Sequence, residues 1–172
     1  LSVIQKDYPY KFYKVTVLSR GGSLGVSQSI SEDDETGFSR EQFEAKIITS
    51  MGGKAAEEII FNLSHTGIAS DFSNATAIAE RMVLFYGMGE ITGFVSYMNP
   101  NAYWNKNSIS QETRREIDLE IRKILDNCYK KAVDLLKTNK ESLEKIAQAL
   151  IVNETLDAKT VYELAGKEEP IK

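Results

Sequence analysis

Residues 66–88 read TGIASDFSNATAIAERMVLFYGM. A polar loop runs into Asp71, and apolar residues then recur at spacings of three and four, which is typical of a helix with one buried face. Gly87 and Gly89 are placed to end this helix. We therefore predict a helix from about Asp71 to Tyr86, whose apolar stripe consists of Phe72, Ala75, Ile78, Ala79, Met82, Val83 and Tyr86.

Asp71 has two interpretations from this stretch alone. An aspartate before an apolar periodic run usually caps the helix. A carboxylate in the first turn also faces the positive end of the helix dipole, which favours the ionised form that a metal requires. The chain's only histidine, His65, lies in the preceding loop and is expected to be exposed to solvent rather than to bind a metal.

The residues before this helix change from a strand pattern to a helical one. Residues 11–30 contain alternating apolar positions and a glycine pair, which predicts two strands or a hairpin, and residues 31–37 form an acidic loop. Ser39 and Gln42 make a capping box, and the helix that follows has an apolar face formed by Phe43, Ile47 and Met51. Gly52 and Gly53 then indicate close packing or a bend before helical character resumes in KAAEEIIF.

The C-terminal part of the chain is predicted to be helical. Residues 90–107 indicate a loop with one short strand at Phe94–Tyr97. A capping box at Ser108 and Gln111 opens a helix to about Lys137, Thr138 with Glu141 caps the next helix, and a short last helix begins near Asp157. The long helix has an apolar stripe of Ile117, Ile121, Ile124, Cys128, Ala132, Leu135 and Leu136, and a charged face of Arg114, Arg115, Glu116, Asp118, Glu120, Arg122 and Lys123.

These elements define a mainly α fold with a small β element near the N-terminus. We expect one domain over residues 1–172, with a β-containing segment at 1–38, helices around the aspartate loop at 39–89 and C-terminal helices at 108–165. The net charge of −4, without a basic patch, argues against nucleic acid as a partner and against polybasic membrane binding. Cys128 is the only cysteine and is expected to be a buried, inert thiol.

Five short motifs follow one another along the chain: YKVTVLSRGGSLG, MGGKAAEEIIF, TGIASDFSNATAIAERMVLFYGM, ETRREIDLEIRKILDNCYKKAVDLL and NETLDAKTVYEL. In this order they resemble the peptidase domain of the FtsH family, the membrane-anchored ATP-dependent zinc metalloproteases of peptidase family M41. The resemblance implies a helical zinc peptidase domain joined to an AAA+ ATPase that uses ATP and magnesium. It also implies homo-hexamers, and unfolded or membrane proteins as substrates. Membrane contact would come only through upstream segments, with this domain on the cytosolic side or on the matrix or stroma side of an organelle.

The resemblance also assigns a role to Asp71. In the family, zinc is held by two histidines of a His-Glu-x-x-His helix and by the aspartate of a Thr-Gly-Ala-Ser-Asn-Asp motif. The matching residues here are Thr66, Gly67, Ile68, Ala69, Ser70 and Asp71, so the resemblance implies that Asp71 is a zinc ligand.

One feature of the family pattern is missing. The sequence has no His-Glu-x-x-His, so no catalytic residue is assigned and the chain alone is expected to be inactive. Since the chain starts at Leu1, we expect it to be a fragment that begins just after this motif. The alternative is a parent that has lost the motif, which would make this chain a non-catalytic oligomerisation domain of an AAA+ ATPase.

Two further groups of residues are candidates for the site. Glu57 or Glu58 would accept a hydrogen bond from a zinc-bound histidine, or else form a carboxylate pair on a surface helix. An edge strand at the rim of the cleft, which would pair with an extended substrate, comprises Gly22, Ser23, Leu24, Gly25 and Val26. The loop Asn99–Asn107 is a candidate surface contact, and the chain alone is expected to form monomers or weak oligomers.

Overall fold

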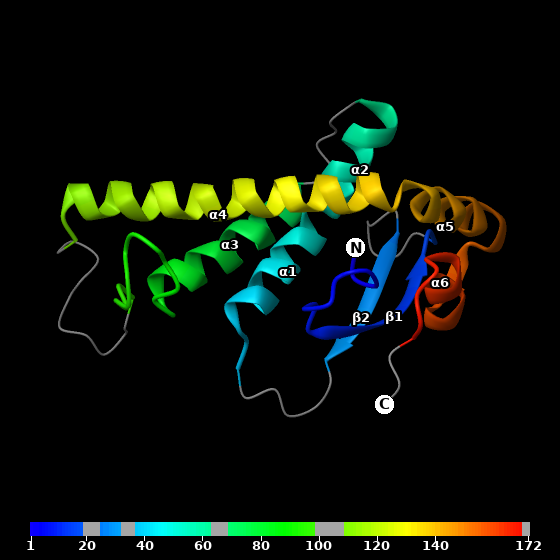
Figure 1. Cartoon of the computed structure of the whole chain (residues 1–172), viewed down its shortest axis with the longest axis horizontal. Coiled ribbons are helices and arrows are strands. Elements are labelled where there is room, and N and C mark those ends of the chain that lie inside the picture. Colours follow the sequence, from blue (N-terminus) through cyan, green and yellow to red (C-terminus); the bar gives the residue numbers. More distant parts are fainter. Residues whose placement is uncertain (19–24, 32–36, 63–68, 99–108, 170–172) are drawn as a thin grey trace. The chain divides into compact units, whose positions relative to one another are not determined.

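The computed structural model describes residues 1–18, 25–31, 37–62, 69–98 and 109–169. The described chain is mainly helical with one small sheet, which confirms the predicted fold class (Figure 1). Its contacts form two compact units, Leu1–Gly37 with Asp134–Lys172, and Phe38–Val133. None of the helices in the described part of the chain has the length and apolar character needed to cross a bilayer.

The first unit contains an antiparallel sheet of three strands. Strand β1 (Tyr10–Thr16) lies between β2 (Val26–Ser31) and β3 (Thr155–Asp157). Val15 is opposite Ser27 on one side and Leu156 on the other. The predicted pair of N-terminal strands is therefore confirmed, while the third strand was not predicted.

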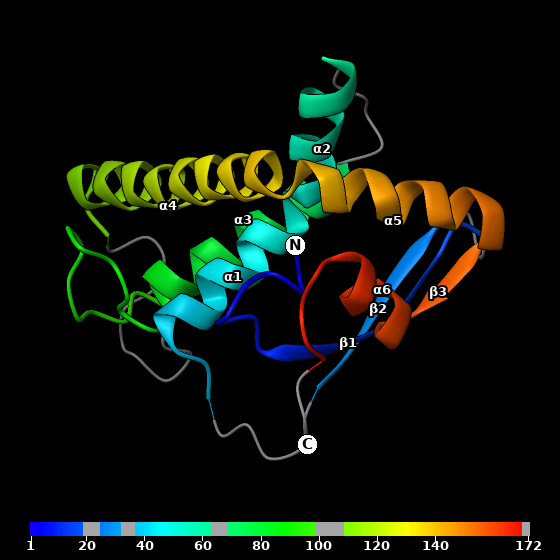
Figure 2. The ribbon, with the colours of Figure 1, turned by 45° about the vertical axis from the view of Figure 1, so that its right-hand side comes forward.

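Two helices complete the first unit, α5 (Lys140–Asn153) and α6 (Ala158–Leu164), which Figure 2 shows beside the sheet. Asp157 caps α6 by accepting a hydrogen bond from the backbone N–H of Thr160 at 2.9 Å, as expected for a helix beginning there. The core of the unit consists of Phe12, Leu156, Val161 and Tyr162. The sheet is therefore stabilised by apolar burial between segments far apart in the sequence.

The predicted capping box at Thr138 and Glu141 is wrong. Thr138 is still the last residue of α4 (Gln111–Thr138), and its hydroxyl donates to the carbonyl of Asp134 at 2.9 Å. Asn139 takes the N-cap position of α5 without a side-chain capping bond. The threonine hydroxyl is bonded within its own helix, so it does not accept a bond from the next one.

The start of α4 also differs from the prediction. Ser110, rather than Ser108, caps the helix, because its Oγ accepts a hydrogen bond from the backbone N–H of Thr113 at 3.1 Å. Ser108 lies outside the described residues.

The second unit contains α1 (Arg40–Ser50), α2 (Gly52–Phe61), α3 (Ala69–Leu84) and α4 as far as Val133. Helices α1 and α3 lie side by side (Figures 1 and 2). The capping box at Ser39 and Gln42 is confirmed. The predicted helical faces are largely buried, with Phe43, Ile47, Met51, Ala75, Ala79, Met82 and Val83 in the core and with Phe72 and Tyr86 exposed at the two ends of the α3 stripe.

The strand predicted at Phe94–Tyr97 is wrong. Instead, this segment folds back onto the C-terminal end of α3, where the backbone N–H groups of Tyr97 and Met98 donate to the carbonyl of Leu84 at 2.8 and 3.2 Å. Gly93 has a φ of +67°, which favours a turn over an extended strand. The backbone of this segment therefore supplies donors to a helix end, and Phe94 is left fully exposed.

Candidate functional site

Asp71 is the third residue of α3 and lies in its first turn. It is therefore not the N-cap residue, and the capping interpretation does not hold. A Cβ atom placed on Gly53 of α2 would lie 3.8 Å from Oδ2 of Asp71, so the α2 backbone runs beside the carboxylate. Partial burial raises the pKa of Asp71, opposite to the effect expected from the helix dipole.

A hydrogen bond fixes the face of α3 that carries Asp71. Asn74, one turn further along α3, donates from Nδ2 to Oγ of Ser50 at 3.0 Å. Ser50 is the last residue of α1, and α2 starts two residues later. Together with the buried Ala75, this bond holds the start of α3 against the junction of α1 and α2.

The two glutamates of α2 have different surroundings. Oε2 of Glu58 accepts a hydrogen bond from the Tyr129 hydroxyl at 2.5 Å and pairs with Nζ of Lys54 at 3.2 Å. Burial, together with the bond to Glu58, raises the pKa of Tyr129 to about 12. Glu58 thus links α2 to α4, while a role of Glu57 or Glu58 toward a zinc-bound histidine stays a prediction.

The donor set around Asp71 is incomplete. Within the described ranges, no three side chains of histidine, cysteine, aspartate or glutamate come close enough together to hold a metal ion. A structural or catalytic zinc site takes three or four protein ligands. Asp71 therefore fits the role of one ligand, whereas the described residues do not fit a complete site. His65 lies outside them.

The predicted substrate strand is described only in part. Gly22, Ser23 and Leu24 lie outside the described residues, whereas Gly25 precedes β2 and Val26 begins it. A Cβ atom on Gly25 would lie 2.9 Å from the carbonyl oxygen of Thr16, so only glycine fits this approach to β1 without a shift. The strand order β2-β1-β3 puts β2 at an edge of the sheet, and no other described strand covers its outer side.

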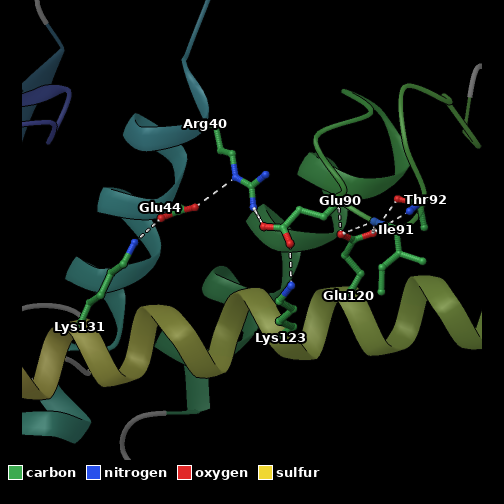
Figure 3. A network of polar contacts seen from close by, with 8 residues as sticks. All are labelled: Arg40, Glu44, Glu90, Ile91, Thr92, Glu120, Lys123 and Lys131. Carbon is green, nitrogen blue, oxygen red and sulfur yellow. Dashed lines mark hydrogen bonds and ion pairs between the residues drawn. The ribbon is translucent and has the colours of Figure 1, made fainter.

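The sequence analysis did not predict one buried acidic residue. Glu120 of α4 is only 2% exposed, although the sequence analysis placed it on the charged face, and that placement is wrong. Its carboxylate accepts bonds from the backbone N–H groups of Glu90, Ile91 and Thr92 and, at 2.8 Å, from the Thr92 hydroxyl (Figure 3). A usable signal existed, because Glu120 is three residues after Ile117 and four before Ile124 in the apolar stripe.

The bonds to Glu120 determine its charge state. Burial alone would raise the pKa of this carboxyl, but the hydrogen bonds from Thr92, Ile91 and Glu90 outweigh it and lower the pKa. A Cβ atom on Gly89 would overlap the Glu120 carboxylate and the Thr92 hydroxyl, so only glycine fits before this loop without displacing them. Glu120 therefore holds residues 90–92 against α4 as a buried anion.

A chain of ion pairs surrounds this anchor (Figure 3). Lys131 pairs with Glu44 at 2.6 Å, Glu44 with Arg40 at 3.2 Å, Arg40 with Glu90 at 3.2 Å, and Glu90 with Lys123 at 2.6 Å. The hydrogen bond from Lys123 is the main reason that the pKa of Glu90 is lowered. Exposed ion pairs contribute little to stability, so this network mainly sets how α1, α4 and the loop are aligned.

The prediction that Cys128 is a buried thiol is confirmed. It is buried, and burial raises the pKa of its thiol to about 12. The thiolate that a nucleophile requires is therefore disfavoured at neutral pH.

Residues 3–164 match the model of a family of peptidases. That family is peptidase family M41, and the chain belongs to it. The shared sequence includes the helix that carries Asp71 and the edge strand β2.

Individual relatives agree with this assignment. The chain is 37% identical over 167 residues to the ATP-dependent zinc metalloprotease FtsH of Streptococcus pneumoniae serotype 4, covering 93% of this chain and 26% of that protein. It is 40% identical over 162 residues to the human ATP-dependent zinc metalloprotease YME1L1, covering 92% of this chain and 20% of that protein. The FtsH of Thermobaculum terrenum is 35% identical over 162 residues. The chain thus spans about a fifth to a quarter of the length of these relatives.

Proposed function

We propose that this chain is the peptidase domain of an ATP-dependent zinc metalloprotease and that Asp71 supplies one zinc ligand. Family M41 membership and the names of the relatives support the activity. The observation that carries the role of Asp71 is its position in the first turn of α3, with the bare backbone of Gly53 beside its carboxylate. A carboxylate oxygen is a normal zinc ligand, and bound zinc supplies Lewis-acid chemistry and an acidified water.

The chain's own residues hold this carboxylate in place. The bond from Asn74 to Ser50 and the burial of Ala75, Ala79 and Met82 fix α3 on α1. Glu120 and its loop hold the other end of α3, because Tyr97 and Met98 in the same segment bond to Leu84. A ligand on a rigid helix is presented with less entropy cost than one on a loop.

We assign the other properties of the proposed enzyme on the same basis. ATP and magnesium belong to the ATPase part of the longer protein, which would act as a membrane-anchored homo-hexamer on unfolded or membrane proteins. The relatives' names include ATP dependence and zinc, and they support these two parts of the assignment.

A second candidate function is a non-catalytic oligomerisation domain of an AAA+ ATPase. It is favoured by one observation, that this chain contains no His-Glu-x-x-His. The sequence of the gene immediately upstream of the codon for Leu1 distinguishes the two, since the peptidase requires paired histidines there and the alternative requires their absence.

The isolated chain is expected to bind zinc at well below one ion per chain and not to cleave unfolded casein, because its described residues contribute one candidate ligand of the three that a catalytic site needs and its sequence has no His-Glu-x-x-His. Metal analysis after exhaustive dialysis, with a parallel casein digest, measures both. One tightly held zinc per chain that disappears in Asp71→Asn would contradict the expectation of an incomplete site.

Substrate binding at the outer edge of β2 is tested by proline at two consecutive positions, Ser27→Pro and Gln28→Pro. Consecutive N–H groups in a strand point to opposite sides, so one proline removes a bond to β1 and the other removes only an outward donor. We call the variant that loses only the outward donor the outward variant, and we expect it to keep its melting temperature. Its cleavage of unfolded substrates in the longer protease should fall roughly tenfold, because about one good hydrogen bond to the substrate is lost.

The two prolines are each other's control, and ATP turnover should be unchanged in the outward variant. Gly25 is avoided because any side chain there would meet the Thr16 carbonyl. Full cleavage by a stably folded outward variant would rule out pairing along β2.

A further inference from the structure

The first unit contains a pocket of about 350 Å³ that the proposed peptidase function does not use. Its walls come from the first eleven residues of the chain and from the end of α6 with the residues that follow it. Pockets that hold small ligands are typically about 300–1,000 Å³, so this one is large enough for a single amino-acid residue or a small aromatic acid.

Aromatic rings form the apolar part of the pocket. Tyr8 and Tyr10 meet edge to face, with ring centroids 5.7 Å apart and an interplanar angle of 86°. Tyr162 is buried and belongs to the core of the unit. Burial raises the pKa of both Tyr8 and Tyr162, so these rings are neutral at physiological pH. The pocket therefore offers fixed aromatic surfaces to an apolar or aromatic group.

Lysines supply the positive charge of the pocket. Lys11 pairs with Glu169 at 3.4 Å, whereas Lys6 and Lys167 make no ion pair within the described part of the chain. The position of Lys167 is set by the end of α6, where Gly166 has a φ of +64° and the N–H of Lys167 donates to the carbonyl of Tyr162 at 3.0 Å. This is a Schellman motif, and it turns the chain back so that Lys167 lines the pocket.

The charge balance limits what the pocket accepts. Glu168 also lines it, and Glu169 neutralises Lys11, which leaves one positive charge in surplus among these residues. A ligand with one negative charge matches this surplus, whereas a polyanion such as a nucleotide triphosphate would be repelled by Glu168.

We propose that this pocket binds one carboxylate attached to an apolar or aromatic body, with Lys6 and Lys167 at the carboxylate and Tyr8, Tyr10 and Tyr162 around the body. This chemistry is shared by the C-terminal residue of a peptide and by a small aromatic acid. The proposal stands independently of zinc, ATP and proteolysis.

The test uses the 172-residue chain and three probes in calorimetry: an acetylated tetrapeptide ending in phenylalanine, the same peptide with an amidated C-terminus, and 3-phenylpropionate. We expect the free-acid peptide to bind at least about tenfold more tightly than the amide, since a charge-assisted bond is lost. If 3-phenylpropionate binds as well as the peptide, the ligand is a small acid; if it binds much more weakly, the ligand is a peptide C-terminus.

Lysine variants test where the probe binds. Lys6→Gln and Lys167→Gln should each weaken the free acid severalfold, and both together roughly tenfold or more. Lys137→Gln, an exposed lysine of the same unit, should leave binding unchanged. Equal binding of acid and amide, no effect of the two pocket lysines in folded variants, or no saturable binding of any of the three probes would overturn the proposal.

Discussion

Replacing Asp71 with asparagine is expected to abolish cleavage of unfolded proteins by the longer protease while its ATP hydrolysis continues. The amide is a much poorer zinc ligand than the carboxylate. Mutation of residues that only hydrogen-bond to a metal ligand typically reduces metal affinity or activity by about 10–100-fold. Loss of a direct ligand should therefore reduce cleavage by at least about 100-fold. The fold should be kept, because the Asp71 side chain is only partly buried and α3 is held by Asn74 and its buried alanines.

The matched control for this experiment is Glu80→Gln. Glu80 is also an exposed acidic residue of α3, about two and a half turns further along, so its change alters the charge of the helix without touching the proposed site. If a normally folded Asp71→Asn variant cleaves substrates within twofold of the unmodified protease, Asp71 is not a zinc ligand.

Replacing Glu120 with alanine is expected to destabilise the second unit strongly. The change leaves the backbone donors of Glu90, Ile91 and Thr92 without their acceptor. The variant loses hydrogen bonds to a buried charge and also leaves buried donors unsatisfied. Together these effects should lower the free energy of unfolding by about 3 kcal/mol. For a chain of this length that corresponds to a melting temperature lower by roughly 10 °C.

The control for Glu120 is Asp118→Asn, an exposed acidic residue of the same helix, which should change the free energy of unfolding by less than about 0.5 kcal/mol. Thermal melts of both variants by circular dichroism make the comparison. Equal melting temperatures for Glu120→Ala and Asp118→Asn would show that the buried carboxylate contributes nothing to stability.

The pKa of Glu120 gives this contribution a pH dependence. Because the pKa of Glu120 is lower in the folded state, the unfolded chain is protonated before the folded chain as the pH falls. The stabilisation is therefore fully present above the ordinary glutamate pKa of about 4.3. It is lost as the pH falls through the lowered folded-state value. The difference in melting temperature between the unmodified chain and Glu120→Gln should therefore shrink below about pH 4.

Local sequence signals predicted much of the fold. The capping box at Ser39, the helix beginning near Asp157 and the apolar stripe of α3 are each determined within a few residues, and each is present in the structure. The three residues of β3 are too few to carry a strand pattern, and they pair with β1 only through a contact about 140 residues apart in the sequence. Long-range pairing of this kind leaves no periodic signal.

The site was harder to predict for two different physical reasons. Asp71 was selected by a family motif, since spacing and charge alone favour a helix cap; the structure places it at the third position of α3, which excludes the N-cap position, while its role as a zinc ligand stays a prediction. Glu120 was missed because a charged side chain usually faces solvent, and its burial depends on three N–H groups that come from a loop 30 residues away. Neither the loop nor its donors can be inferred from the α4 sequence.

The most direct measurement is anomalous X-ray diffraction at the zinc absorption edge from crystals of the longer protein. A zinc peak about 2.0–2.2 Å from a carboxylate oxygen of Asp71 is the result that the proposed function predicts. A fully occupied zinc site whose ligands do not include Asp71 would contradict it.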